Sequence, residues 1–587
     1  MPRSLGSRDV ATIAGAALVL NLLPFVPALV SPLPLSPLFP LCVDAVVLCS
    51  VAILTYGTRF ERWGIGAAAL GLGAVLLYQT YDAIVYSAFG RSGLFYDDVQ
   101  YVVDLLYFAR DSASVTTVLG MAGGAAALGG VGWMLPKLMR AVARGRHHAG
   151  CRRFLVAVHL VTWPLVLIVA PWQQWGPENL TYQTSNERVR VRTVATKAVE
   201  NTQASLRLRS MLDSLRTAPV DSTYAHYDTL RWHRRPNVFL LMIESYGEVL
   251  NHHPDLRAPY RDMMRRLETD LSADGWHAAS AWSDTAVRGG RSWLAIASVF
   301  LGTRVGHQLL YEQFQAHPDV PPHLVRLLKR QGYQTITLQP YMKARPGLPV
   351  SNPYGFDVTL YRDDLPYDGP PYGWGFVDVP DQWSLGYTHE QHVAPSEQPV
   401  FLFFETVLSH ALWNYGVPPV LDDWRDFGTS VAASDVRRAS LDAASETPPL
   451  LPDSLTMPRI VDQPTPQRFL RHIAYEWQVM RQYLRTAVPP NSLVIIMGDH
   501  QPPLLPTETF GVPMHVLSRD AALVEPFHDG GYVPGLLLDD ASPRRTHAGL
   551  YSEWVRAITR VNPSTHQPLP PRKPTGVAPS ILMESSR

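Results

Sequence analysis

Two strongly apolar runs of the sequence each lead directly to acidic or imidazole side chains. The run 237–243 is followed by Glu244, and the run 492–497 is followed, after one glycine, by Asp499 and His500. Apolar runs of this length are typical of buried strands, and an acid at the end of one is costly unless it is paired. Two carboxylates and an imidazole are ligands that suit Mn, Mg or Zn. The sequence therefore predicts a metal site at the edge where these strands end.

A serine and a further histidine complete the candidate set. Ser292 follows a glycine pair and begins a helix predicted over 292–301, and His410 follows an apolar strand predicted over 399–407. The N–H groups and the dipole of a helix N-terminus favour a phosphate group. A serine oxygen beside a divalent metal would act as a nucleophile at neutral pH. Together these residues predict phosphoryl chemistry on a serine.

Each of these residues also has a purely structural interpretation. Glu244 could cap a junction between strand and loop, Ser292 could be an N-cap, and an Asp-His pair is common on protein surfaces. His410 alone is a weak signal. The functional interpretation depends on the whole set, on its order along the chain and on the position of its members at strand ends.

Alternating strands and helices must position these residues. We expect strands over 237–243, 335–338, 399–407, 492–497 and 512–517, and helices over 262–271, 292–301, 323–331, 467–486 and 547–561. This alternation indicates an α/β domain around a mostly parallel sheet. In such sheets the chemistry gathers at the carboxyl ends of the strands, where the candidate residues lie.

Composition narrows the class of protein. The 587 residues contain 51 Lys and Arg against 51 Asp and Glu, so the formal net charge is zero, which argues against binding nucleic acid by broad phosphate neutralisation. Hydrophobic residues make up 46% and aromatic residues 10%, which excludes a disordered chain. No cysteine follows Cys151, so the C-terminal half holds neither a disulfide framework nor a Cys-rich zinc site.

The first 175 residues predict a membrane region of five helices. Apolar stretches lie at roughly 10–30, 39–57, 64–85, 114–135 and 154–172, each near the ~20 residues that span a bilayer. Basic residues gather at the N-terminus, after the second stretch and after the fourth, and cytoplasmic loops carry such an excess. An odd number of spans then leaves the N-terminus in the cytoplasm and everything after Trp172 outside. The scarcity of buried charges argues against a transporter.

The rest of the chain divides by composition. Residues 176–235 are expected to be a juxtamembrane linker with an amphipathic helix near 191–215, which either lies against the membrane or the domain or serves as a spacer. Residues 236–561 are the predicted catalytic domain. Within it, 416–464 is expected to be a surface insertion, and 562–587 is expected to be a disordered Pro-rich tail.

Three segments together carry a family resemblance. NVFLLMIES, GGRSWLA and MGDH, in this order, resemble motifs of the sulfatase-like branch of the alkaline phosphatase superfamily. Five predicted spans before such a domain look like the lipoteichoic acid synthase and phosphoglycerol or phosphoethanolamine transferase group. The motif resemblance covers about residues 236–560. It implies a multi-pass protein of the bacterial inner (cell) membrane, with the catalytic domain periplasmic or extracellular.

The resemblance also implies roles for the residues at the predicted metal site. Glu244, Asp499 and His500 match the family's metal ligands. Ser292 matches the nucleophile position, which holds Ser or Thr and also contacts the metal. The expected cofactor is a divalent metal ion: Mn is the ion we expect, and Zn and Mg are the alternatives.

On the substrate side the resemblance implies three further residues. His410 matches a substrate-contacting histidine that follows the apolar strand. Trp374, in the segment YGWGFVDVPDQW, loosely matches a residue that contacts the head group. Arg291, next to the nucleophile, is either an anion clamp or an ordinary exposed arginine.

The sequence also departs from the family pattern. Ser292 is not followed by the x-P-x-R continuation of true sulfatases, so conversion to formylglycine is not expected. Glu244 is followed by Ser245 and not by a second acid, which favours a single metal. Gln501 stands where the family usually has glycine, which puts the loop after His500 in doubt.

The combined expectation is a membrane-anchored, metal-dependent transferase. It would move a phospho-head-group, phosphoglycerol or phosphoethanolamine, from a phospholipid donor to an envelope glycan, lipid or polymer through a covalent serine intermediate. A sulfatase-like phosphodiesterase or sulfuric-ester hydrolase on the same fold is the first alternative, with water in place of the acceptor. A non-catalytic membrane scaffold or sensor is the second, and it should bind no stoichiometric metal.

Overall fold

A computed structural model of the chain divides into two compact units, Met1–Met211 and Leu212–Arg587. The described residues are 7–101, 115–160, 193–215, 224–316, 322–343, 352–372, 377–427, 450, 465–562 and 568–578, apart from a few single positions within these ranges.

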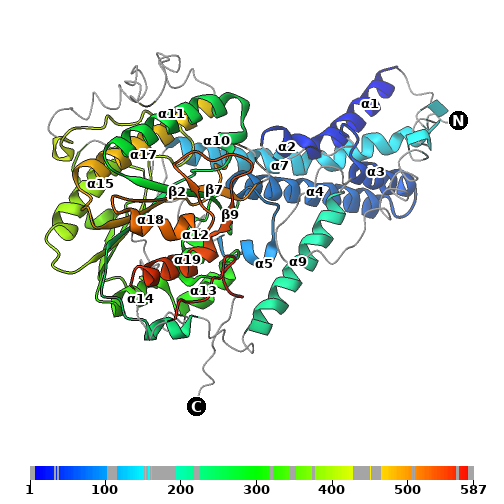
Figure 1. Cartoon of the computed structure of the whole chain (residues 1–587). Helices are drawn as coiled ribbons and strands as arrows, with labels where there is room; N and C mark the ends of the chain where they lie inside the picture. Colours follow the sequence, from blue (N-terminus) through cyan, green and yellow to red (C-terminus); the bar gives the residue numbers. More distant parts are fainter. Residues whose placement is uncertain are drawn as a thin grey trace. The chain divides into compact units, whose positions relative to one another are not determined.

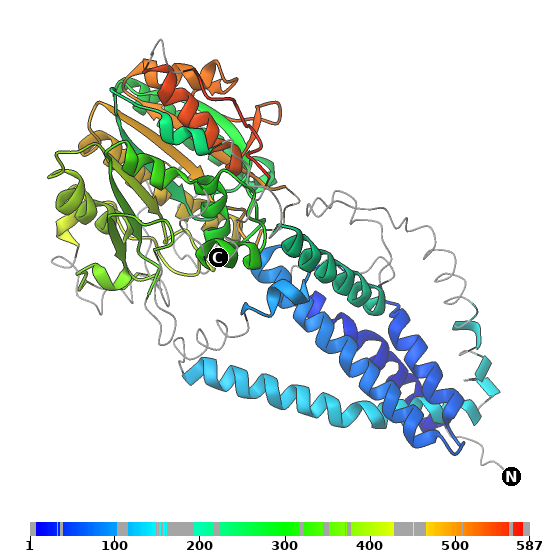
Figure 2. The ribbon, with the colours of Figure 1, turned by 90° about the horizontal axis from the view of Figure 1, so that it is seen from below.

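The first unit is a set of apolar helices. They are α1 (Ser7–Leu22), α2 (Val26–Leu29), α3 (Val43–Thr55), α4 (Glu61–Phe89), α5 (Phe95–Asp98) and α7 (Val115–Arg144). The longer helices α1, α3 and α4 pack together, and α7 joins them through its C-terminal half, whereas its N-terminal half diverges from them in Figure 2. Their shared core contains small residues such as Ala52, Ala68 and Ala69. Small side chains let helix backbones approach closely, which suits packing in lipid.

The prediction of five spanning helices is not met among the described residues. Two helical segments there are long and apolar enough to cross a membrane, Arg8–Leu29 and Glu61–Phe89. The second predicted span forms only the 13 residues of α3, because the chain around Pro40 stays outside the helix. At 1.5 Å per residue this helix is ~20 Å long, shorter than the ~30 Å hydrocarbon core. The helix α7 covers the fourth predicted span, and most of the fifth lies outside the described residues.

The linker contains the helix α9 (Val194–Leu215). Its first turns are fastened to the first unit by polar contacts. Lys197 Nζ lies 2.9 Å from Asp82 Oδ2, and the Val194 N–H donates to Asp44 Oδ2 over 2.8 Å. Asp82 is fully buried, so Lys197 pairs with a charge that would be costly if left alone. The helix therefore packs on the first unit and is not a free spacer.

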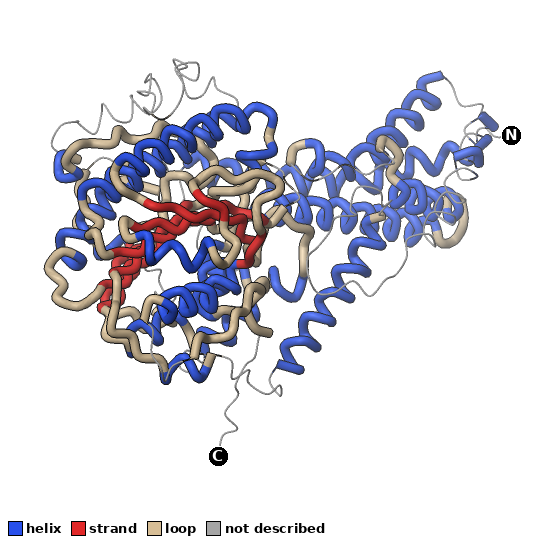
Figure 3. The backbone as a smooth tube through the Cα atoms, viewed as in Figure 1, coloured by secondary structure: helices blue, strands red, loops and turns tan. Residues whose placement is uncertain are grey.

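The second unit is built on one sheet, shown in red in Figure 3. Its strands are β1 (Asn237–Ile243), β2 (His277–Asp284), β3 (Gln334–Gln339), β4 (Val358–Tyr361), β5 (Val400–Glu405), β6 (Ser492–Gly498), β7 (Gly511–Ser518), β8 (Val533–Pro534) and β9 (Arg544–Thr546). The spatial order is β4-β3-β5-β1-β6-β7-β2-β8, and β9 pairs with β2. The first five of these strands are parallel, whereas β7 runs antiparallel to β6 and β2 antiparallel to β7. The sheet is thus mixed and not purely parallel.

Helices cover both faces of this sheet. They are α10 (Val249–His252), α11 (Pro254–Ala273), α12 (Ser292–Leu301), α13 (Gln308–Ala316), α14 (Leu324–Arg330), α15 (Asp381–Thr388), α17 (Thr465–Thr486), α18 (Ala521–His528) and α19 (His547–Arg560). Figure 1 shows α11 and α17 on one face and α12 and α19 on the other. Every residue of β5 and β6 is buried, and both faces of these strands are covered. That is why they appear in the sequence as continuous apolar runs.

Part of the segment predicted to be a disordered tail packs on the second unit. Residues 568–578 are described, and the Val577 N–H donates to the carbonyl of Gly302 over 2.9 Å. The hydroxyl of Ser552 in α19 donates to the carbonyl of Lys573 over 3.1 Å. The tail therefore continues the fold past α19 before the chain leaves the described residues. Of the predicted insertion 416–464, most lies outside the described residues.

Candidate active site

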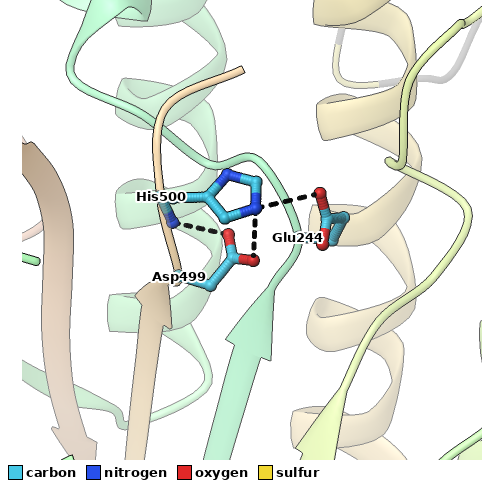
Figure 4. A group of neighbouring side chains, drawn as sticks. All are labelled: Glu244, Asp499 and His500. Atoms are coloured by element: carbon cyan, nitrogen blue, oxygen red, sulfur yellow. Dashed lines mark hydrogen bonds and ion pairs between the residues drawn. The ribbon is translucent and has the colours of Figure 1, made fainter. Parts of the chain in front are cut away.

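The two strands that carry the predicted ligands are neighbours in the sheet. The strands β1 and β6 pair in parallel, and their last paired residues are Ile243 and Gly498. Glu244 and Asp499 each come one residue later, so both leave the sheet at the same edge. Figure 4 shows their carboxylates and the His500 ring turned toward one another.

The ligand atoms of Glu244, Asp499 and His500 all lie within 4.8 Å of one another, and the three residues are buried. His500 Nε2 is 3.2 Å from Asp499 Oδ2 and 3.6 Å from Glu244 Oε1. Among the described residues, this is the group of His, Cys, Asp and Glu side chains whose spacing could hold a metal ion. Buried charges at this separation need a partner of opposite sign.

Ser292 completes the cluster from a different element. It is the first residue of α12, and its hydroxyl donates to Glu244 Oε2 over 3.2 Å. Its Oγ is also 3.4 Å from His500 Nε2. The helix therefore presents both the serine oxygen and the positive end of its dipole to the carboxylate cluster.

Residues in the left-handed backbone conformation flank the cluster. Ser245 has φ 61° and Arg291 has φ 61°, and Gly290 before it has φ 57°. A non-glycine residue in this region costs about 1–2 kcal/mol and persists where the surroundings enforce it. At Ser245 the enforcing contact is its N–H, which donates to Asp499 Oδ1 over 2.8 Å. The strained backbone at Ser245 and Arg291 is thus directly adjacent to Glu244 and Ser292, two residues of the candidate active site.

The hydrogen bonds around His500 and Asp499 fit a bound cation. His500 Nδ1 lies 2.9 Å from the carbonyl oxygen of Gln501, so this nitrogen carries the proton that it donates. When a metal ion is bound, Nε2 would be the nitrogen that offers it a lone pair. Asp499 Oδ2 is buried and receives no hydrogen bond. Two carboxylates, an imidazole and a hydroxyl are a ligand set suited to Mn, Zn or Mg.

The pKa values of the two carboxylates move apart. Burial and the charge of Glu244 raise the pKa of Asp499 to about 7. Burial acts to raise the pKa of Glu244 as well, but the charges of His500 and His410 bring it below its usual value. Two carboxylates this close disfavour joint ionisation, and a divalent cation between them would remove the repulsion.

The unusual Gln501 has a structural role in the loop after His500. Its N–H donates to the carbonyl of Arg288 over 2.9 Å, which ties the loop to the segment before Ser292. Its side-chain oxygen accepts from the Val249 N–H over 3.2 Å, and its amide donates to the carbonyl of Gly511. The glutamine therefore holds three segments together behind the metal ligands.

The three residues predicted to contact the substrate are His410, Arg291 and Trp374, and the structure describes the first two. His410 is half-buried in the loop after β5, and its charge lies close enough to act on the Glu244 carboxylate. Arg291 is buried, with 4% of its side chain exposed, so it is not an ordinary surface arginine. Trp374 lies outside the described residues.

Sequence reasoning missed Glu405, the last residue of β5. It is fully buried, and burial and the charges of Asp499 and Glu244 raise its pKa well above the usual value. Its Oε2 accepts from the hydroxyl of Tyr341, which follows β3, whereas Oε1 has no hydrogen-bond partner. The signal was present, because Glu405 ends an apolar strand just as Glu244 does.

A second pair of buried acids supports the loop that carries His410. Asp381, the first residue of α15, accepts from the N–H groups of Val407 and Leu408 over 3.0 and 2.8 Å. Glu476 of α17 faces Asp381 and is also fully buried. Burial raises the pKa of Asp381 to about 7 and that of Glu476 well above its usual value. The pair therefore keeps a proton that two exposed carboxylates would lose.

We expect Glu476→Gln to reduce the pH dependence of stability. An acid whose pKa is higher in the folded state stabilises the fold fully below its unfolded pKa, and this contribution is lost as pH rises through the folded pKa. The amide mimics the protonated acid and does not titrate. Between pH 5 and pH 8 the wild type should lose stability relative to the variant by about 1.4 kcal/mol per pH unit at most. Thermal unfolding at several pH values measures this difference, and parallel profiles would contradict it. The exposed Glu525→Gln serves as the control.

No protein-family model matches the sequence, and no curated protein matches it. Several solved structures are similar to the chain. The lipooligosaccharide phosphoethanolamine transferase EptA of Neisseria meningitidis, an integral membrane protein, is 12% identical over 90% of this chain and 94% of its own, with a TM-score of 0.41. The lipoteichoic acid synthase LtaP of Listeria monocytogenes is 14% identical over 63% of this chain and 80% of its own, with a TM-score of 0.34. The periplasmic domain of EptC from Escherichia coli, in complex with Zn, is 15% identical over 55% of this chain and 82% of its own, with a TM-score of 0.33.

Proposed function

We propose that this chain, which resembles the sulfatase-like branch of the alkaline phosphatase superfamily, is a membrane-anchored, metal-dependent phosphotransferase. The observation that carries the proposal is the position of Ser292. Its Oγ lies 3.2 Å from Glu244 Oε2 and 3.4 Å from His500 Nε2, at the N-terminus of α12. A serine that only capped a helix would have no need of two buried carboxylates and an imidazole around its oxygen.

In the first half of the proposed reaction, the phospho-head-group moves from the lipid to Ser292. Glu244, Asp499, His500 and Ser292 would hold a divalent cation, which when bound neutralises charge on the phosphoryl oxygens. Ser292 Oγ attacks the phosphorus of a phosphodiester, and its proton passes to Glu244 Oε2, the oxygen to which it donates, as the new bond forms. The bond from phosphorus to the lipid oxygen breaks, and that oxygen takes up a proton to leave as diacylglycerol. His410 is the proposed donor of this proton.

The second half of the reaction releases the serine. A hydroxyl of an envelope glycan, lipid or polymer attacks the same phosphorus, and the bond to Ser292 Oγ breaks. The attacking hydroxyl gives its proton to His410, which lost one in the first half, and Ser292 Oγ regains the proton held by Glu244. The partially positive N-terminus of α12 favours the phosphate group in both halves of the reaction.

The apolar helices of the first unit suit a lipid donor. Two of them, Arg8–Leu29 and Glu61–Phe89, are long and apolar enough to cross a membrane. An enzyme held in the membrane meets its lipid substrate at a high effective concentration. We propose that the donor is a phospholipid with a phosphoethanolamine or phosphoglycerol head group, and that the protein is a cell-membrane protein whose catalytic domain lies outside the cytoplasm.

Product analysis tests transfer directly. The full-length protein is incubated with Mn, with phosphatidylethanolamine or phosphatidylglycerol labelled in the head group, and with or without an envelope glycan preparation. We expect diacylglycerol to form with one of the two lipids and the label to appear on the glycan. Formation of diacylglycerol should slow when the glycan is left out, because the serine is then not released.

Two other outcomes would count against the proposal. Release of the free head group at the same rate with and without acceptor would make the protein a phosphodiesterase. No diacylglycerol from either lipid, with a metal-free protein, would favour a non-catalytic scaffold.

A further inference from the structure

A cavity of about 400 Å³ lies in the second unit, away from the cluster around Ser292. It is formed by the C-terminal part of α18 and the turn after it, by α19, and by the segment 568–578 that follows α19. The helices α18 and α19 pack against each other, and both are labelled in Figure 1. None of the residues proposed for catalysis lines this cavity. Its volume is within the range of small-molecule sites in proteins.

Two arginines in the cavity wall contact carbonyl groups of the backbone. Arg556 Nη1 donates to the carbonyl of Pro570 over 2.6 Å, and Arg572 Nη1 lies 3.4 Å from the carbonyl of Gly530. Within the part of the chain that the structure describes, neither lies within 4.0 Å of a carboxylate oxygen, although the charge of Arg572 acts on Glu553 from a greater distance. Two other arginines nearby do, since Arg560 pairs with Asp529 over 2.5 Å and Arg545 with Glu553 over 3.4 Å. The lining of the cavity thus combines three arginines, Arg556, Arg560 and Arg572, with two acids, Asp529 and Glu553, and keeps an excess of positive charge.

The close approach of Arg572 to the turn after α18 depends on Gly530. A Cβ atom at Gly530 would lie 2.9 Å from Arg572 Nη2 and 2.8 Å from the carbonyl oxygen of Phe527. The absence of a side chain lets the guanidinium of Arg572 enter the wall of the cavity from the segment 568–578. That segment thus brings Arg572 into the same cavity lining as Arg556.

A buried carboxylate lies in the same wall. Only 4% of the Glu553 side chain is exposed, and Glu553 Oε2 accepts from the hydroxyl of Tyr532 over 2.5 Å. Its Oε1 receives no hydrogen bond, although Arg545 Nε lies 3.4 Å away. A buried acceptor without a donor is costly and is expected to meet a donor from a ligand. The wall thus offers two guanidinium groups for an anion and one acceptor for a hydroxyl or ammonium group.

We propose that this cavity binds a small organic anion in which a phosphate or carboxylate group is carried beside a hydroxyl or ammonium group. Guanidinium groups bind such anions through paired, charge-assisted hydrogen bonds. The anionic group lies between Arg556 and Arg572, and the donor group faces Glu553 Oε1. Because Arg572 comes from the segment 568–578, the bound anion also fastens that segment to α19. The site is separate from Ser292 and does not depend on the reaction proposed there.

Calorimetric titration of the full-length protein with glycerol 3-phosphate tests the site. EDTA is present, so that the probe cannot bind through a metal at the cluster around Ser292. We expect saturable binding of one equivalent by the wild type and by Ser292→Ala. The double variant R556Q/R572Q should bind at least about tenfold more weakly, which corresponds to the loss of one strong charge-assisted contact. A control with the same loss of charge is R257Q/R266Q, two exposed arginines of α11, and it should bind as the wild type does.

Further measurements keep the result interpretable. The single variant R572Q, changed in a surface segment, should keep its thermal stability and still bind more weakly than the wild type. A soluble lipid, dihexanoylphosphatidate, distinguishes the source of the phosphate: binding tenfold tighter than that of glycerol 3-phosphate assigns the site to a lipid head group, and equal binding assigns it to a free phosphate ester. Absence of saturable binding in the wild type, or equal affinity in R556Q/R572Q and the control, would overturn the proposal.

Discussion

Glu244→Gln should lose its metal and at least about 99% of its turnover. The change keeps the size of the side chain but removes one of the two charges that face His500 Nε2. Loss of an outer-shell partner of a metal ligand already lowers affinity about 10–100-fold, so loss of a charged ligand should cost at least 100-fold. Without the cation, charge on the phosphoryl oxygens is unopposed, which costs about 10²–10³ in rate.

Elemental analysis of the purified variant and the rate of diacylglycerol release measure both effects. The exposed Glu525→Gln serves as the control for loss of one carboxylate. A variant that kept a full equivalent of metal and the wild-type rate would show that Glu244 only ends a strand. The backbone at this position should stay in place, because the Glu244 N–H donates to Thr406 Oγ1 over 3.1 Å.

Ser292→Ala should abolish turnover while leaving the metal bound. The substitution removes the proposed nucleophile, and loss of a nucleophile lowers kcat by factors of about 10⁴ or more in enzymes that use one. The other three ligands remain, so the metal content should stay close to one equivalent. The loss of activity and the retention of metal together distinguish a nucleophile from a residue that only builds the site.

Ser292→Thr is the matched variant. It keeps a hydroxyl at the first position of α12, where Ser292 is half-buried. We expect it to retain measurable turnover, reduced by the packing of one extra methyl group. Equal activity of Ser292→Ala and the wild type would remove the serine from the mechanism.

The sequence could predict the strands that carry the site because their residues are buried on both faces. The bounds predicted for 237–243 are those of β1, and the predicted 492–497 differs from β6 by one residue. The helix over 292–301 is α12. In each case a long apolar run or a glycine pair marks the boundary, so local pattern and tertiary position agree.

Other parts of the fold are harder to predict from the sequence. The strand β2 (His277–Asp284) consists mostly of Ala, Ser and other small or polar residues, and it is buried because it pairs with β7 along its length. The left-handed conformation of Arg291 and Ser245 has no sequence signal, since neither is glycine. The helix α3 is shorter than the apolar stretch that predicted it, because hydropathy alone does not indicate where a helix begins.

The mass of the Ser292 peptide is the measurement that tests the central claim most directly. The full-length protein is incubated with Mn and each phospholipid without acceptor, quenched, digested and analysed by mass spectrometry. We predict that the peptide gains the mass of phosphoethanolamine or phosphoglycerol, that the gain disappears when an acceptor glycan is added, and that Ser292→Ala never shows it. Steady release of diacylglycerol with no modified peptide at any time, or the same modification in Ser292→Ala, would contradict a covalent serine intermediate.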